Sequence, residues 1–382
     1  MGLIAYAVVT LVIVIGVVSG NNPGTPSNPP TTPTLVGDCA TKAAHEGLAQ
    51  SSVPELKKLA EYESACQGSF TQQQMLFASM PQTMSEATDA AQDMTATLKS
   101  LHSQSVSPLV IFEPADLRPQ GGSLKDYYQG KYDAPLKAYF QTLQKQGITD
   151  EMMGTWVPFP EANTPAWGTT DASDFAANIQ KVVGLQKLYF PDSKASILLN
   201  DQTYPDNDAN WEHGTYASLV PYVEHIPAGL LDSFGYQGFP WMPEANDTTA
   251  PSVLKASEFL RTDLATEAAK KLGTKKVWLN TGTFNTAHTQ SPDTKVTMSV
   301  ERRKQILKEI LDQVKAFQKE DFEVTVSLFS QDKSTMDEGV DWSYWQQGKP
   351  QSGQATTVFK EFARDVLKSN AHLLVYDATS EN

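Results

Sequence analysis

The feature that most constrains the fold is a regular alternation of short β-branched or aromatic runs with longer amphipathic stretches. The short runs are typical of buried strands, and they span residues 34–37, 74–80, 108–114, 154–159, 195–200, 229–236, 276–280 and 322–329. The longer stretches repeat apolar residues every three to four positions, as helices covering a sheet do, and they span 53–66, 84–103, 133–146, 171–189, 213–224, 253–272 and 299–320. Interleaved strands and helices predict an α/β protein, the (β/α)8 TIM barrel.

A flat doubly wound sheet is the competing architecture, and it ranks second because no Gly-rich turn follows any predicted strand. Helix starts are marked by polar residues in capping positions, namely Asp133, Asp171 and Ser299, and by a capping box of Thr83 and Glu86. The run at 372–377 follows the last predicted helix, and we expect it to pack on the outside of the barrel.

The N-terminus forms a segment of its own. Residues 3–20 contain no charged side chain and are just long enough to cross a bilayer, so residues 1–20 are expected to be a transmembrane anchor or a cleaved signal. Residues 21–33 are rich in Pro and Thr, which predicts an extended linker before a barrel domain at 34–382. Both alternatives predict that the barrel is exported. An anchor would hold it at the cell surface with the membrane as a partner, and a cleaved signal would release it to the extracellular space.

Composition and charge restrict the partners. The chain has 382 residues, of which 40% are hydrophobic and 19% charged, as in a globular protein with a large core. The net charge of −14 argues against nucleic acid, because phosphate binding needs clustered Lys and Arg. A neutral polysaccharide or oligosaccharide suits this charge better. The histidines show no metal-ligand spacing and the sequence has no phosphate loop, so we expect no metal and no cofactor.

The two cysteines, Cys39 and Cys66, give conflicting indications. Export favours a disulfide between them. In the predicted barrel, however, Cys39 lies at the mouth and Cys66 ends the first helix, about 18 Å away. A disulfide needs Cα atoms within about 7 Å, so the pairing stays open.

In a (β/α)8 barrel the carboxyl ends of all strands open on one mouth, where active sites form. The residues predicted at those ends are Asp38, Glu113, Glu161, Asn200, Asp201, Gln237, Asn280 and Asp332. We expect Glu113 to position a neighbour by hydrogen bonds and Asp232 to hold a loop amide. Tryptophans can stack on pyranose rings, and the loop tryptophans offered for this are Trp167, Trp211 and Trp241. Trp156 and Trp278 lie inside strands and are expected in the core.

Several of these segments stand in an order that resembles a known family. The runs are SPLVIFEPADL, GSLKDYYQGKYDAPLKAYFQTLQKQG, GTWVPFPEANTPAWG, LLDSFGYQGF, KKVWLNTG and VSLFSQDKS with a later DW. This order is similar to glycoside hydrolase family 26, the endo-β-mannanases with a (β/α)8 barrel, over roughly residues 34–370. The resemblance implies that Glu161 is the general acid/base at the end of the fourth strand. Asn163 and Trp167 match the family pattern there, and Pro160 replaces its His.

The sequence departs from this family at the second catalytic carboxylate. The family's nucleophile is a Glu just before Thr-Gly at the end of the seventh strand, and Asn280 stands in its place. The family's Tyr that hydrogen-bonds the nucleophile corresponds to Phe239, two residues after Gln237. Retaining hydrolysis needs two carboxyl groups about 5 Å apart, and an amide cannot form the glycosyl ester.

Three functional interpretations follow. The first is a surface protein that binds mannan-like β-linked polysaccharide with impaired or absent retaining hydrolysis; its ligand-binding residues are Asn163, Trp167, Glu113, Trp211, Gln237, Phe239, Trp241 and Asp332. The second is an active glycoside hydrolase in which Glu161 is the acid. There, Asn280 orients a substrate acetamide, or Asp201 or Asp332 is the base of an inverting mechanism. The third is a non-catalytic structural envelope or adhesion module.

Overall fold

The computed structural model describes residues 73–103, 107–114, 124–163, 171–200, 219–240, 255–288, 295–329, 332–333, 340–341 and 372–376, together with 362, 365 and 369. All of them belong to the unit that spans Leu35–Asn382. The predicted anchor, the linker, the predicted strand at 34–37 and both cysteines lie outside the described residues. Among the described residues, none of the helices combines the length and the apolar character that a membrane span requires.

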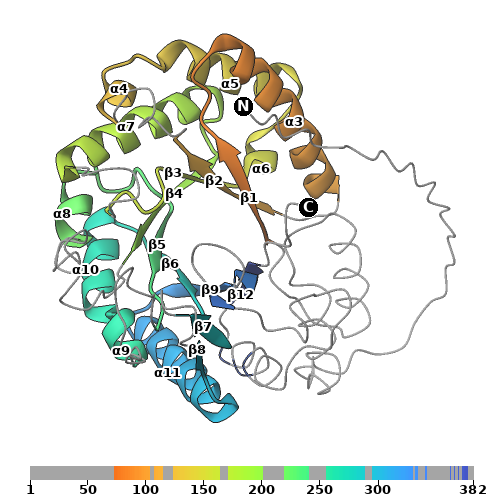
Figure 1. Ribbon diagram of the computed structural model, residues 1–382. Helices are drawn as coiled ribbons and strands as arrows, with labels where there is room; N and C mark the ends of the chain where they lie inside the picture. Colours follow the sequence, from red (N-terminus) through yellow and green to blue (C-terminus); the bar gives the residue numbers. More distant parts are fainter. Residues whose placement is uncertain are drawn as a thin grey trace, which may run out of the picture. The chain divides into compact units, whose positions relative to one another are not determined.

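Eight strands form one parallel sheet, in which each strand pairs with the next. In sheet order they are β1 (Gln73–Ser79), β2 (Ser107–Glu113), β3 (Thr155–Pro158), β4 (Lys194–Asn200), β5 (Ser233–Gln237), β6 (Lys276–Thr281), β9 (Glu323–Phe329) and β12 (His372–Tyr376). The sheet curves so that β1 and β12, at its two ends, have Cα atoms within 8 Å of each other. The result is a parallel α/β half-barrel (Figure 1).

The helices connect these strands and cover the outer face of the sheet (Figure 1). They are α3 (Met84–Ser103), α4 (Lys125–Tyr128), α5 (Asp133–Lys145), α6 (Asp150–Met153), α7 (Ala172–Tyr189), α8 (Leu219–Glu224), α9 (Ala256–Phe259), α10 (Thr262–Leu272) and α11 (Val300–Lys319). Their apolar faces pack on the outward side chains of the strands and form the main hydrophobic core. Trp156 belongs to this core, as predicted, and its indole Nε1 donates to the carbonyl of Met153 at 2.8 Å.

Three of the four predicted helix caps are present. The side chains of Asp171 and Ser299 cap α7 and α11 as predicted, because each accepts a hydrogen bond from a backbone N–H of the first turn. The capping box is also confirmed, with Thr83 and Glu86 each bonding the other's backbone N–H at 3.2 Å. The prediction for Asp133 is wrong, since it is the first residue of α5 and forms an ion pair with Lys181 at 2.7 Å instead.

The strand content differs from the prediction in one respect. Seven predicted strands are confirmed, and the remaining strand of the sheet is β12, which pairs in parallel with β9. The run that was expected on the outside is therefore part of the sheet. Its central residues Leu373, Leu374 and Val375 are apolar at consecutive positions, a sequence pattern typical of parallel strands.

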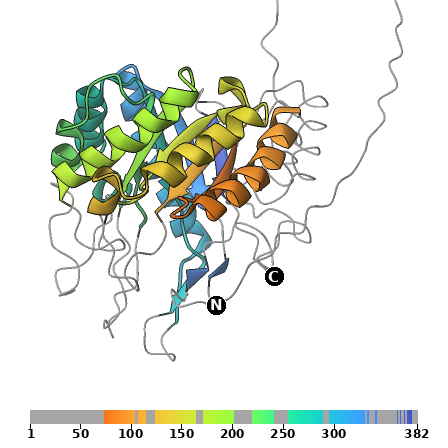
Figure 2. The ribbon, with the colours of Figure 1, turned by 90° about the horizontal axis from the view of Figure 1, so that it is seen from above.

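A second, antiparallel sheet has the order β10-β11-β7-β8. Its strands are β7 (Thr286–His288), β8 (Lys295–Thr297), β10 (Asp332–Lys333) and β11 (Val340–Asp341). They come from the segments that follow β6 and β9, and Figure 2 shows the teal pair β7 and β8 extending away from the helical layer. None of its four strands is among those predicted from the sequence.

The inner face of the half-barrel is filled by apolar side chains. They form one cluster of Met75, Leu109, Ile111, Val157, Leu198 and Trp278. In the strand register Leu198, Gly235 and Trp278 lie side by side on β4, β5 and β6. The Trp278 indole lies over Gly235 and donates to the Ser196 hydroxyl at 3.0 Å. Trp278 is thus buried, as predicted. Its side chain fills part of the inner face two residues before the polar row at the carboxyl ends of the strands.

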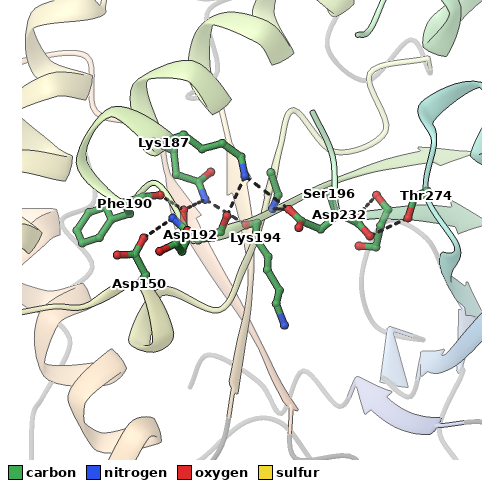
Figure 3. A network of polar contacts seen from close by, with 12 residues as sticks. Asp150, Lys187, Phe190, Asp192, Lys194, Ser196, Asp232 and Thr274 are labelled. Atoms are coloured by element: carbon green, nitrogen blue, oxygen red, sulfur yellow. Dashed lines mark hydrogen bonds and ion pairs between the residues drawn. The ribbon is translucent and has the colours of Figure 1, made fainter. Parts of the chain in front are cut away.

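Asp232 lies at the opposite, amino end of the strands, just before β5 (Figure 3). Its carboxylate accepts from the backbone N–H of Ala195 at 2.9 Å and lies 3.8 Å from the Lys187 ammonium. Its carbonyl accepts from the Thr274 hydroxyl at 2.7 Å. The predicted structural role of Asp232 is confirmed, because these bonds join the starts of β4, β5 and β6.

The contact of Trp278 with Gly235 yields a stability prediction. A Cβ atom at position 235 would meet Trp278 Cε2 and would lie 2.6 Å from the carbonyl oxygen of Ile197. Gly235→Ala is expected to lower the free energy of unfolding by about 2 kcal/mol through overpacking. Urea denaturation measures this effect.

The matched control is Gly184→Ala in α7, where a new Cβ meets nothing within 4 Å. This substitution should raise the free energy of unfolding by about 0.5 kcal/mol, because alanine restricts the unfolded chain. Equal effects of the two substitutions would contradict the packing of Trp278 against Gly235.

Candidate active site

A row of polar residues ends the inner face of the half-barrel. The register pairs Asn200 on β4 with Gln237 on β5, Gln237 with Asn280 on β6, and Asn280 with Ser327 on β9. Paired residues of parallel strands point to the same face, and this row follows the Leu198–Gly235–Trp278 row two residues later. All four side chains are buried, with exposed fractions of 8% or less. This buried polar row follows the apolar row of Leu198, Gly235 and Trp278 toward the carboxyl ends of the strands, and we take this end as the candidate site.

Glu161 reaches the same end from a strained turn after β3. Phe159 and Glu161 both have positive φ angles, 53° and 55°, which cost energy for residues with a side chain. The surroundings hold the turn, because the backbone N–H of Glu161 donates to the carbonyl of Leu198 at 2.8 Å. The Asn163 amide donates to the carbonyl of Asn200 at 2.7 Å and accepts from its N–H at 2.9 Å. Asn163 thereby extends the pairing of β4 and positions Glu161.

Glu161 and position 280 are joined through Gln237. The side-chain Nε2 of Gln237 donates to Glu161 Oε1, and the side-chain Oε1 of Gln237 accepts from Asn280 Nδ2 at 2.5 Å. These three side chains come from the segments that end β3, β5 and β6. We call this chain of bonds the Glu161–Gln237–Asn280 relay. Asn280 Oδ1, at the end of the relay, is buried and has no hydrogen-bond partner among the described residues.

Glu113 is the second carboxylate at this end, and it lies on β2 next to β3. Burial is the main cause that raises its pKa above the ordinary value, and the negative charge of Glu161 raises it further. The protonated form of Glu113 is therefore favoured more than that of an ordinary Glu, and Glu161 accepts a hydrogen bond from Gln237.

The remaining predicted site residues are distributed as follows. Phe239, the counterpart of the family's Tyr, is 6% exposed and belongs to the main core. The side chain that bonds Asn280 is that of Gln237 on β5. Asp332 opens β10 in the second sheet. Trp167, Trp211, Trp241, Asp38 and Asp201 lie outside the described residues. Within the described ranges, no group of three or more His, Cys, Asp or Glu side chains is arranged to hold a metal ion.

Sequence reasoning missed Ser327. It lies inside β9, two residues before the strand ends, whereas the residues predicted at the mouth lie at or next to the predicted strand ends. The signal was the alternation in EVTVSLF, where Val324 and Val326 are buried in the main core and Thr325 and Ser327 take the other face.

The comparison with known proteins rests on structure. No known family profile matches the sequence, and no curated protein sequence matches it. A solved β-glycosidase, BGL167, has a TM-score of 0.54 at 12% identity, covering 87% of this chain and 85% of its own. The β-glucosidase from Thermotoga maritima with methoxycarbonyl-substituted glucoimidazole has a TM-score of 0.52 at 11% identity, covering 84% and 87%.

At this level of identity the likeness concerns the fold. The chain has the parallel α/β half-barrel that matches the barrels of these glycoside hydrolases. The expectation of a glycosidase-like fold is thus confirmed, and membership of family 26 stays a prediction from the sequence motifs.

The environment of Glu113 yields a pH prediction. A carboxyl group with a raised pKa in the folded state binds more protons than in the unfolded state, so its contribution to stability is present at low pH. That contribution is lost as the pH rises from about 4.3, the ordinary value for Glu, through the folded pKa. Glu113→Gln should remove this loss, so its melting temperature should exceed that of the wild type increasingly as the pH rises from about 4.3 through the folded pKa of Glu113.

Thermal denaturation across that range measures the difference. Glu267→Gln, at an exposed position of α10, is the control and should follow the wild-type curve. A Glu113→Gln curve that runs parallel to the wild type at all pH values would show that Glu113 titrates normally.

Proposed function

We propose that the chain is an exported, glycoside-hydrolase-like protein that binds mannan-like β-linked polysaccharide where the strands end, with impaired or absent retaining hydrolysis. The observation that supports this most directly is the Glu161–Gln237–Asn280 relay, in which an amide stands where a second carboxylate would be needed. Completion of the half-barrel to a closed (β/α)8 barrel is part of the proposal, and the approach of β1 to β12 supports it.

The chemistry of the relay disfavours double displacement. A nucleophile must form a covalent ester with the anomeric carbon, and the Asn280 amide cannot form one. Its nitrogen is also engaged as a donor to Gln237. Binding needs no such group, because hydroxyl-rich ligands are recognised by amides, carboxylates and aromatic faces. The buried polar row offers these amides and Glu161, and we propose Trp167 as a stacking surface.

A carbohydrate ligand is also consistent with the structural neighbours. The β-glucosidase from Thermotoga maritima has been solved in complex with castanospermine and with deoxynojirimycin, at TM-scores of 0.52 and 0.51 to this chain. Since these likenesses concern the fold, the carbohydrate specificity of the present chain rests on its own residues.

A second candidate function, an active hydrolase with different catalytic groups, is favoured by Glu113. The raised pKa of Glu113 beside Glu161 gives the site two carboxyl groups in different environments, as general acid–base catalysis with Glu161 as the acid requires. Such an enzyme would use an inverting mechanism, or a substrate-assisted one in which Asn280 orients an acetamide. The third alternative is a structural envelope or adhesion module without a ligand.

Incubation of the full chain with β-mannan, cellulose-type and chitin-type oligosaccharides separates these functions. We expect binding of mannohexaose by calorimetry with few new reducing ends. Trp167→Ala should weaken binding about tenfold, because a stacking surface is lost, and Glu161→Gln should leave affinity within about threefold. Reducing ends that appear with the wild type and disappear with Glu161→Gln would favour the hydrolase, and neither binding nor release would favour the structural module.

Two variants of position 280 serve as a matched pair. Asn280→Glu supplies the missing carboxylate and, although it loses the bond to the Gln237 side-chain oxygen, should produce a low but measurable release of reducing ends, whereas Asn280→Gln has the same length and should not. Equal release by both variants would contradict the assignment of position 280 as the missing nucleophile.

Export and tethering rest on residues 1–20. Expression of the full chain is expected to place it in the membrane fraction or, if the segment is cleaved, in the medium. Removal of residues 1–20 should leave it inside the cell, and an unchanged distribution would contradict the proposal.

A further inference from the structure

Two neighbouring residues at the end of the relay each have a buried polar atom without a partner among the described residues. Asn280 on β6 and Ser327 on β9 are register partners and therefore point to the same face of the sheet. Asn280 Oδ1 and Ser327 Oγ have no hydrogen-bond partner among the described residues, and the exposed fractions of the two residues are 8% and 0%. Buried polar groups are normally paired, so two neighbouring exceptions at a candidate site call for an explanation.

The relay fixes which kind of group Asn280 presents. An ionised Glu161 can only accept, so the Gln237 nitrogen must face it and the Gln237 oxygen must face Asn280. Asn280 therefore turns its nitrogen towards Gln237, and its oxygen is left as a pure acceptor. Ser327 beside it has a hydroxyl, which can donate one hydrogen bond and accept others.

We propose that Asn280 and Ser327 form a subsite for one hydroxyl group of a neutral sugar. The ligand hydroxyl donates its hydrogen to Asn280 Oδ1 and accepts the hydrogen of Ser327 Oγ, which satisfies both atoms at once. This inference rests on the proposed function and deepens it by assigning Ser327 to ligand binding and by naming the ligand group that is read.

Other ligand groups fit this pair less well. In an acetamide the N–H donor and the C=O acceptor point in opposite directions, so the group does not serve Asn280 Oδ1 and Ser327 Oγ from a single position. A carboxylate can accept from Ser327 but cannot donate to Asn280, and it would be repelled by Glu161 and by the net charge of −14. A hydroxyl is the common sugar substituent that donates and accepts through one atom.

The proposal predicts that one substitution affects stability and affinity in opposite ways. Ser327→Ala removes a buried hydroxyl that has no partner in the free protein, so the melting temperature should stay the same or rise. The same substitution leaves the ligand hydroxyl without its donor, so affinity should fall about tenfold. A residue with a merely structural role would lose stability and keep its affinity.

Thr281→Val is the matched control. Thr281 Oγ1 is also buried without a partner among the described residues. Strand alternation, however, places it on the opposite face of β6 from Asn280. Its removal should likewise leave or raise the melting temperature, and it should change affinity by less than about twofold.

The test measures binding of mannohexaose and of N-acetylchitohexaose to the full chain and to both variants by calorimetry, with melting temperatures alongside. The expected result is binding of mannohexaose that Ser327→Ala weakens and Thr281→Val does not. Unchanged affinity of Ser327→Ala, or a parallel loss of stability, overturns the subsite while the proposed function stands.

Preferred binding of N-acetylchitohexaose that is insensitive to Ser327→Ala would also overturn it, in favour of an acetamide ligand. Absence of binding by the wild type to both oligosaccharides would overturn the proposed function and this inference together.

Discussion

The register of the parallel strands is the constraint on which the rest of the structure depends. Because the side-chain period of a strand is two and paired residues share a face, the pairings of β4, β5, β6 and β9 stack two rows on the inner face. The Leu198–Gly235–Trp278 row is apolar and the row from Asn200 to Ser327 is polar. A slip of one residue in β6 would turn Trp278 outward and replace Asn280 by Thr281, which would remove both the apolar row and the relay.

The relay is stable only because each of its members has the right hydrogen-bonding character. Burial of an amide without a partner costs about 1–3 kcal/mol, and Gln237 avoids this cost by donating to Glu161 and accepting from Asn280. The position of Glu161 depends in turn on the strained turn that Asn163 holds against β4. The relay therefore links the ends of three strands. The Glu161 carboxylate at one end determines which way the amide groups of Gln237 and Asn280 are oriented.

Sequence reasoning was most successful where the deciding interactions are local. The strands β1 to β6 and β9 follow from apolar runs, and the caps at Asp171, Ser299 and Thr83 follow from bonds within one helical turn. The prediction that Asp133 caps a helix failed, because its side chain forms an ion pair with Lys181, which is distant in the sequence. β12, the second sheet and Ser327 depend on which segments meet in space, which a local pattern does not specify. The resemblance placed Glu161 and Asn280 at strand ends, whereas their link through Gln237 needed coordinates.

Gln237 also explains why an amide suits position 280. A carboxylate there would add a negative charge to a site in which the charge of Glu161 already raises the pKa of Glu113. It could not donate to the Gln237 oxygen, so the Gln237 amide would have to donate to two carboxylates and its oxygen would lose its partner. Asn280 avoids both penalties, because it is neutral and donates where Gln237 accepts. Gln237 and Asn280 are thus a matched pair of amides on neighbouring strands.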